Sequence, residues 1–176
     1  MRWTKLKQRI EDCFAESAKG RVEVWNTRYR NSHDQEGEAW ITIDKIQVHS
    51  MGSLTYLVKY YEQSTQIQQE RACQDYGDDQ QIKGYLAAQE EVQQRLRNDG
   101  TIPLEEFNST LFEYLNLSIE EILGSDQMVL RALGMFDKRL GKRRLKSLNL
   151  SSDHELVQSF FRIRCAFEGI RPQLDT

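Results

Sequence analysis

The feature that most constrains the fold of this chain is a block of β-forming residues from Arg21 to Met51, flanked on both sides by helical sequence. The polar stretch NSHDQEG at 31–37 and the pair Asp44-Lys45 divide it into three short runs of β-branched and aromatic residues. Short runs joined by polar turns favour antiparallel strands that pair in chain order. The block therefore predicts a three-stranded antiparallel β-meander that is covered on one face only.

The sequence before this block has helical periodicity. Apolar residues recur there at the spacing of one helix face, namely Trp3, Leu6, Ile10, Cys13 and Phe14. This spacing predicts a helix over 3–18 that ends near Gly20.

After the pair Gly52-Ser53 the period is helical again, and it stays so to the end of the chain. Ser53 can cap a helix whose apolar positions are Leu54, Leu57, Val58 and Tyr61. Further helices are predicted over 82–96, from Pro103, from about Asp126 with a bend or end near Gly141, and over 153–168 with Gly169 behind it. Ser118 with Glu121, and Ser152 with Glu155, fit the capping-box pattern at two helix starts.

These elements predict a single α+β domain over 1–176. Its first part, 1–52, comprises the N-terminal helix and the β-meander. The remainder, 53–176, is a bundle of about five helices. A hydrophobic content of 39% in 176 residues allows one sizeable core, and gives no reason for a second domain.

The composition indicates the cellular compartment of the protein. No window is apolar for long enough to span a membrane or to form a signal peptide. The three cysteines, Cys13, Cys73 and Cys165, stand far apart, which is typical of free thiols in a reducing compartment. We therefore expect a cytoplasmic protein without a membrane partner.

Motifs for metal and cofactor binding are missing. The cysteines and histidines have no spacing that places two ligands on one face, and there is no glycine-rich phosphate loop. We therefore expect neither a metal nor a cofactor, and no catalytic residue is assigned. An enzyme of hydrolase type stays open as an alternative, in which His33 or His49 acts as a general base beside Asp34 or Asp44.

A basic run gives a second alternative, because six of the nine residues from 138 to 146 are Lys or Arg in a chain of net charge -3. On a helical wheel Arg139, Lys142, Arg143 and Lys146 lie opposite the apolar stripe. They form either a solvated face or the contact surface of a nucleic-acid-binding accessory protein. Trp25 and Trp40 are expected in the core of the helix-covered sheet rather than in such an interface.

Arg144 differs from the rest of the run because it continues the apolar stripe, as Arg164 does in the last helix. An unpaired charge on a buried face is costly, so each arginine needs an anionic partner. One interpretation is a structural ion-pair network of Asp137, Arg144, Arg164 and Glu168. The other is that both arginines line a groove for a carboxylate-bearing protein partner.

Several segments together resemble an uncharacterised bacterial family of similar length: the opening MRWTKLKQRIEDCF, the strands RVEVWNTRYR and GEAWITID, and the segment DKRLGKRRL. The resemblance spans the whole chain. It implies one conserved unit and brings no established activity, cofactor or partner.

Because motifs for metal binding, cofactor binding and catalysis are missing from the sequence, we favour a protein that acts through protein contacts, as an adaptor, immunity or regulatory component. Nucleic-acid binding through the basic run and hydrolysis through His33 and His49 are the alternatives. The sequence does not set the oligomeric state.

Overall fold

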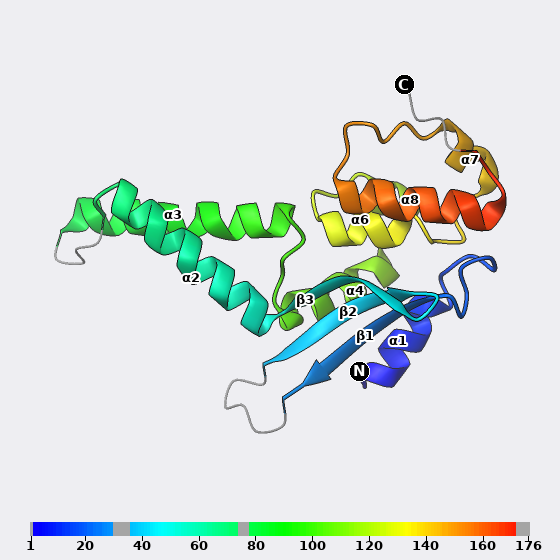
Figure 1. Cartoon of the computed structure of the whole chain (residues 1–176), viewed down its shortest axis with the longest axis horizontal. Helices are drawn as coiled ribbons and strands as arrows, with labels where there is room; N and C mark the ends of the chain where they lie inside the picture. Colours follow the sequence, from blue (N-terminus) through cyan, green and yellow to red (C-terminus); the bar gives the residue numbers. More distant parts are fainter. Residues whose placement is uncertain (1, 30–35, 74–77, 172–176) are drawn as a thin grey trace.

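The computed structural model describes residues 2–29, 36–73 and 78–171, and Figure 1 shows a helix, a sheet and then a series of helices. The elements are α1 (Trp3–Glu11), β1 (Val22–Arg28), β2 (Gly37–Ile43), β3 (Ile46–Gly52), α2 (Ser53–Glu70), α3 (Asp79–Asn98), α4 (Leu104–Asn116), α5 (Ile119–Leu123), α6 (Met128–Gly134), α7 (Lys142–Ser147) and α8 (Glu155–Glu168). The predicted α+β class is confirmed. Seven helices of the described ranges follow the sheet where about five were expected, because the helix predicted from Asp126 is divided into α6 and α7 and the helix that Ser118 starts is the short, separate α5.

The sheet is the predicted antiparallel meander, in the order β1-β2-β3. Asp44 and Lys45 form the turn between β2 and β3 with φ of 49° and 68°, the conformation that suits a two-residue hairpin. Ile41 pairs with His49 while Thr42 pairs with Gln47, so Val48 is an extra residue in β3. This β-bulge bends the edge of the sheet.

Helices cover one face of the sheet, as the sequence predicts. α4 lies against β2 and β3, while α1 lies against β1 and α4 (Figure 1). The covered face carries the buried residues Val22, Val24, Ala39, Ile41 and Ile43. Trp25 and Trp40 are half-buried on the opposite face, where their rings stack with centroids 6.3 Å apart. The expectation that both tryptophans belong to the core was wrong, because residues two apart along a strand share a face and theirs is the open one.

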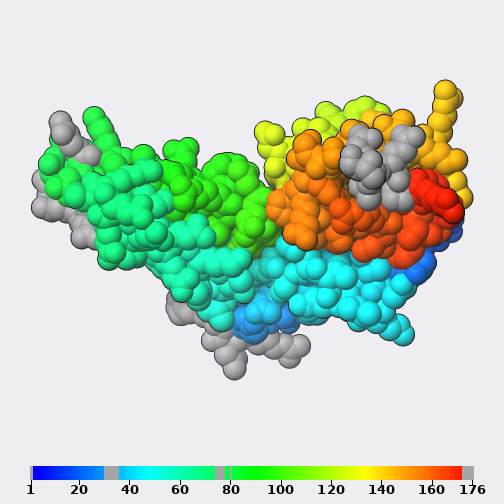
Figure 2. Space-filling view, turned by 45° about the horizontal axis from the view of Figure 1, so that its top comes forward, coloured from blue at the N-terminus to red at the C-terminus, as the bar shows by residue number. Residues whose placement is uncertain are grey.

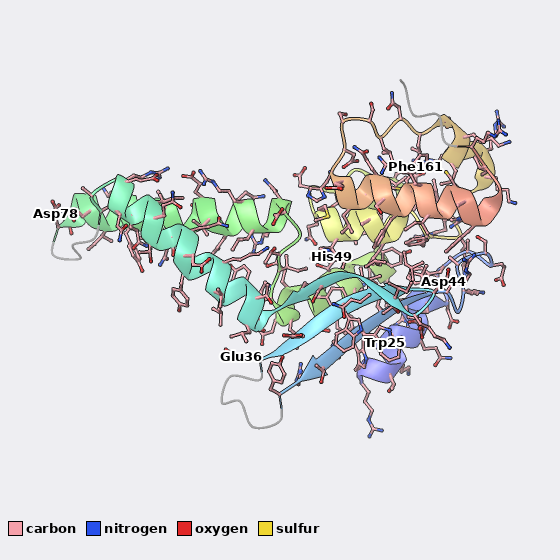
Figure 3. All side chains as sticks on the ribbon, viewed as in Figure 1. Trp25, Glu36, Asp44, His49, Asp78 and Phe161 are labelled. Carbon is pink, nitrogen blue, oxygen red and sulfur yellow. The ribbon has the colours of Figure 1, made fainter. Side chains whose placement is uncertain are left out.

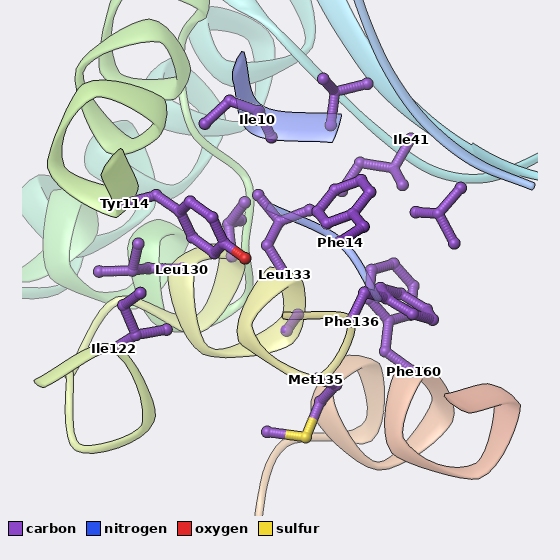
Figure 4. Close-up of a cluster of buried hydrophobic side chains, with 14 of the residues drawn as sticks. Ile10, Phe14, Ile41, Tyr114, Ile122, Leu130, Leu133, Met135, Phe136 and Phe160 are labelled. Carbon is purple, nitrogen blue, oxygen red and sulfur yellow. The ribbon is translucent and has the colours of Figure 1, made fainter. Parts of the chain in front are cut away.

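The main core forms where α1, the covered sheet face, α4, α6 and α8 meet (Figure 4). Phe14, Phe136 and Phe160 pack ring against ring at its centre, with centroids 6.2 and 5.2 Å apart. A continuous apolar cluster of this kind supplies most of the driving force for folding.

α2 and α3 form a helical hairpin that projects away from this core (Figures 1 and 2). The two helices have a small apolar cluster of their own, built from Ile67, Ala88, Val92 and Leu96 with Tyr56 and Tyr60 packed against it. The hairpin therefore holds together through contacts separate from the main core.

Two predicted helices are shorter than expected, for one reason. α1 ends at Glu11 rather than near 18, and the helix predicted from Asp126 through 140 ends at Gly134. The residues that come after each helix bond to one another: the Ala15 amide donates to the Phe136 carbonyl at 2.8 Å, and the Lys138 amide donates to the Cys13 carbonyl at 2.9 Å. These long-range bonds replace helical bonds that local periodicity predicted.

The helix caps were predicted in part. The Ser118–Glu121 capping box is present, with both reciprocal bonds formed at the start of α5. Gly169 ends α8 in the left-handed conformation, at φ 67°. The capping box of Ser152 and Glu155 was wrong, because His154 caps α8 by accepting the Leu156 amide at its side chain.

Candidate functional site

Asp137 is the centre of a buried polar cluster in the loop after α6. Its side chain is fully buried and accepts a hydrogen bond from the Tyr114 hydroxyl at 2.7 Å. Arg139 donates to it three times, from its backbone amide at 2.7 Å and from its side chain at 2.8 and 3.0 Å. Both carboxylate oxygens are thereby satisfied.

The charge states in this cluster result from these bonds. Burial alone would raise the pKa of Asp137, but the hydrogen bonds from Arg139 and Tyr114 outweigh it and hold the pKa below its ordinary value. Burial, together with the negative charge of Asp137, raises the pKa of Tyr114 well above its ordinary value. At neutral pH the pair is therefore an ionised carboxylate bonded by a neutral phenol.

Arg164 lies beside this cluster on α8 and is 2% exposed. Its guanidinium donates to the Phe136 carbonyl at 2.9 Å and, with longer bonds of 3.4 Å, to the carbonyls of Met135, Asp137 and Leu140. Its Nε contacts Glu168 at 3.0 Å, the i, i+4 pair expected from the sequence. Arg164 thus ties α8 to the loop in which the predicted long helix breaks.

Glu168 joins two more parts of the chain to Arg164. It accepts a hydrogen bond from the Ser17 hydroxyl at 2.5 Å and forms an ion pair with Lys142 at 2.9 Å. Burial would raise the pKa of Glu168, but the bonds from Ser17 and Lys142 lower it overall. The carboxylate is therefore ionised and already engaged by three donors from within the chain.

Arg144 does not reach this cluster. It lies on the surface of α7 and contacts Glu120 of α5 at 2.5 Å, with 40% of the Arg144 side chain and 65% of the Glu120 side chain exposed. The structure thus brings Asp137, Arg164 and Glu168 together, with Arg139, Tyr114, Ser17 and Lys142 as additional members. It leaves Arg144 outside, because α7 starts a new helix at Lys142 whose phase is unrelated to that of α6.

The basic residues proposed for nucleic-acid binding divide into two pairs. Arg139 and Lys142 are ion-paired to Asp137 and Glu168. Arg143 and Lys146 are exposed. Because half of the positive charge is neutralised internally, this segment is a weaker attractant for phosphates than its sequence indicates.

The residues of the hydrolase alternative are not seen as one site. His33 and Asp34 lie outside the described residues. Asp44 is in the turn before β3, where Arg21 binds both of its oxygens at 2.6 and 2.8 Å, and Figure 3 shows it away from His49. His49 contacts the Gly100 carbonyl at 3.2 Å through Nε2.

His49 instead faces a groove that no sequence pattern indicates. The groove, about 270 Å³ in volume, runs beside β3 and is lined by Val48, His49, Asp99 and the start of α8 at His154, Glu155 and Leu156. Burial lowers the pKa of His49. The lining residues come from three distant parts of the chain, so their spacing could not reveal the groove.

Large apolar side chains are exposed on β3 and on the projecting hairpin, and also at Tyr29 and Phe112. On α2, Leu54, Val58 and Tyr61 are 52, 50 and 62% exposed. On β3, Ile46 and Val48 are 69 and 38% exposed. α2 packs against α3 through a different face, which carries Tyr56, Tyr60 and Ile67. The amphipathic stripe of α2 that the sequence displays is therefore turned outward.

Within the described ranges, no three His, Cys, Asp or Glu side chains are grouped so that they could hold a metal ion. The same ranges contain no helix that is long and apolar enough to cross a membrane. Cys13, Cys73 and Cys165 are free thiols, of which Cys73 and Cys165 are buried.

Comparison with known proteins gives a family but no activity. No curated protein and no solved structure matches the chain. The model of the SF0329 protein family matches residues 2–165, and this family description names no substrate, ligand or partner. The match agrees with the resemblance to a family without an established function. Because it covers nearly the whole sequence, the chain belongs to the SF0329 protein family.

Proposed function

We propose that this protein acts by binding another protein, as an adaptor, immunity or regulatory component of a bacterial cytoplasm. The observation that carries the proposal is the outward stripe of Leu54, Val58 and Tyr61 on α2, which we call the α2 stripe. Residues at i, i+4 and i+7 form one continuous helix face, and this face lies on a hairpin that projects from the main core. A projecting apolar helix face is a common way to present a contact surface to a partner.

The energetics of the hairpin support this proposal. The three side chains of the α2 stripe are each at least half exposed, so covering them would add about 1 kcal/mol each, or about 3 kcal/mol together. The hairpin does not use them for its own packing, which rests on Ile67, Ala88, Val92 and Leu96. Keeping them exposed offers no folding benefit to the isolated chain and provides an anchor for a partner.

A site-specific cross-link tests the proposal. A photoreactive benzoylphenylalanine replaces Tyr61 in the α2 stripe or, as a control, Glu90, which is exposed on α3. After irradiation in cells of the native host, we expect the Tyr61 probe to give a cross-linked partner that the Glu90 probe does not give.

Substitutions then link the partner to the α2 stripe. Val58→Glu places a charge in the stripe and should abolish the cross-link, whereas Thr55→Glu adds the same side chain to an exposed position of α2 outside it and should not. Equal products from both probes, or a cross-link that survives Val58→Glu, would contradict the proposal.

A further inference from the structure

The two edges of the sheet differ in how far other parts of the chain cover them. At the β1 edge, the Val24 amide donates to Glu11 at 3.1 Å and Lys7 donates to the Val24 carbonyl at 3.0 Å. Lys7 and Glu11 are themselves an ion pair at 2.6 Å on α1. α1 therefore satisfies the backbone of this edge at Val24 with side chains and obstructs the addition of another strand there.

The β3 edge is open along its first half. Ile46, Gln47 and Val48 are all exposed, and Figure 2 shows the cyan surface of this part of the chain uncovered beneath the orange surface of α8. In a two-residue hairpin the pair that closes the turn, Ile43 and Ile46, exchanges both backbone bonds, so the next pair, Thr42 and Gln47, does not. The amide and carbonyl of Gln47 consequently point away from β2, toward the open edge.

The groove beside β3 complements this edge with negative charge. Asp99 and Glu155 both line it, and both are exposed. Asp99 has two long contacts, with Lys59 at 3.6 Å and with the Thr101 hydroxyl at 3.5 Å, and Lys59 donates to Thr101 at 3.0 Å. Val48 and Leu156 add apolar walls. The groove thus combines an apolar lining with two carboxylates, a combination that suits the aliphatic stem and cationic end of a lysine or arginine side chain.

Of the two histidines of the groove, His49 is the one that can accept a hydrogen bond from a cation. His49 donates from Nε2 to the Gly100 carbonyl, which leaves its Nδ1 as an acceptor. His154 uses its Nδ1 to accept the Leu156 amide and cap α8. The lowered pKa of His49, caused by burial, keeps its ring neutral at neutral pH.

We propose that β3 binds an extended, basic peptide segment of a partner as a fourth strand, with one of its lysine or arginine side chains in the groove between Asp99 and Glu155. Backbone bonds at Gln47 hold the segment, and the carboxylates of the groove select its charge. This site is distinct from the α2 stripe and goes beyond the proposed function, because it specifies the conformation and the charge of the segment that is bound.

The test uses a fluorescein-labelled ten-residue peptide of alternating valine and threonine with one central lysine. A second peptide differs only in having glutamate at the centre. At low ionic strength, fluorescence anisotropy should give at least about tenfold tighter binding for the lysine peptide than for the glutamate peptide. The lysine forms two partly screened ion pairs with the carboxylates of the groove, whereas the glutamate is repelled by them. The combined variant Asp99→Asn with Glu155→Gln should reduce this preference to less than about threefold.

Backbone recognition is measured separately. The lysine peptide should slow hydrogen exchange at Gln47, and N-methylation of every second peptide amide on the side facing β3 should prevent binding. Val58→Glu, which disables the α2 stripe, should leave peptide affinity unchanged, so the two proposals can fail independently. No binding of the lysine peptide at millimolar concentration, equal binding of both peptides, or exchange protection on α2 in place of β3 would overturn the inference.

Discussion

Replacing Arg164 by methionine tests whether the buried polar cluster holds the last helix in place. The arginine is 2% exposed and donates to Glu168 and to four backbone carbonyls of residues 135–140. Methionine reproduces the arginine side chain as far as Nε and has no donor. The substitution therefore keeps the packing of the apolar stem and removes the guanidinium with its polar contacts.

The expected loss is worked from the individual contacts. Removing one partner of a buried ion pair costs about 3–5 kcal/mol, because the other partner remains desolvated. Glu168 retains Ser17 and Lys142, which places the expected loss at the lower end, about 3 kcal/mol. A domain of ordinary stability has only about 5–15 kcal/mol of unfolding free energy, so this is a large fraction.

Urea unfolding followed by circular dichroism measures the effect. With a slope of about 2 kcal/mol per molar urea, the Arg164→Met midpoint should fall by about 1.5 M. Arg144→Met is the matched control, since its ion pair with Glu120 is exposed and such pairs contribute about 0–1 kcal/mol. A loss below about 1 kcal/mol for Arg164→Met, or equal losses for both variants, would refute a structural role for the cluster.

Local contacts lead to three further expected outcomes. Tyr114→Phe should lower the unfolding free energy by about 1.5–3 kcal/mol at pH 7. The pKa of Asp137 is lowered in the fold, so its stabilising contribution is complete above the ordinary aspartate pKa and is lost as the pH falls through the lowered value. Urea unfolding near pH 3 should therefore show a smaller difference in unfolding free energy between Tyr114→Phe and the parent protein than at pH 7. A difference at pH 3 as large as that at pH 7 would contradict this reasoning. Ser118→Ala should cost about 1 kcal/mol by removing a formed cap, while Ser152→Ala, outside the cap of α8, should leave the urea midpoint unchanged. A thiol reagent should modify half-exposed Cys13 before buried Cys73 and Cys165, as mass spectrometry of the products would show. The reaction of Cys13 should be slow, because burial raises its pKa. Modification of Cys165 before Cys13 would count against the described packing of α8.

The parts of the fold that the sequence predicted are those with local causes. The three strands result from short β-forming runs, and the turn at Asp44 and Lys45 needs only two residues with positive φ. The start of α5 results from Ser118 and Glu121, which satisfy each other's backbone donors within one turn. Each of these features is decided by residues within a few positions of one another, which is the range that a sequence pattern samples.

The parts that the sequence could not predict depend on contacts between distant residues. Helical periodicity runs past Gly134, yet the helix stops there because residues 136–138 bond to residues 13–15. The break gives α7 a new helical phase, which is why Arg144 is exposed while Arg164 is buried. The groove beside β3 likewise combines His49, Asp99 and His154 through tertiary structure alone.

The open β3 edge and the α2 stripe occupy one uninterrupted stretch of chain, residues 46–61, which bears on how a partner would use them. β3 passes directly into α2 at Ser53, so a strand bound at Gln47 and a surface bound at Val58 have a fixed spacing within the fold. A single partner that covers both would lose affinity non-additively when Val58→Glu is combined with Asp99→Asn and Glu155→Gln, since losing one contact weakens the positioning of the other. Two separate partners would each respond to one set of substitutions only. Of the two edges of the described sheet, α1 covers the β1 edge at Val24, and so a partner that binds by strand addition is expected at the open first half of β3.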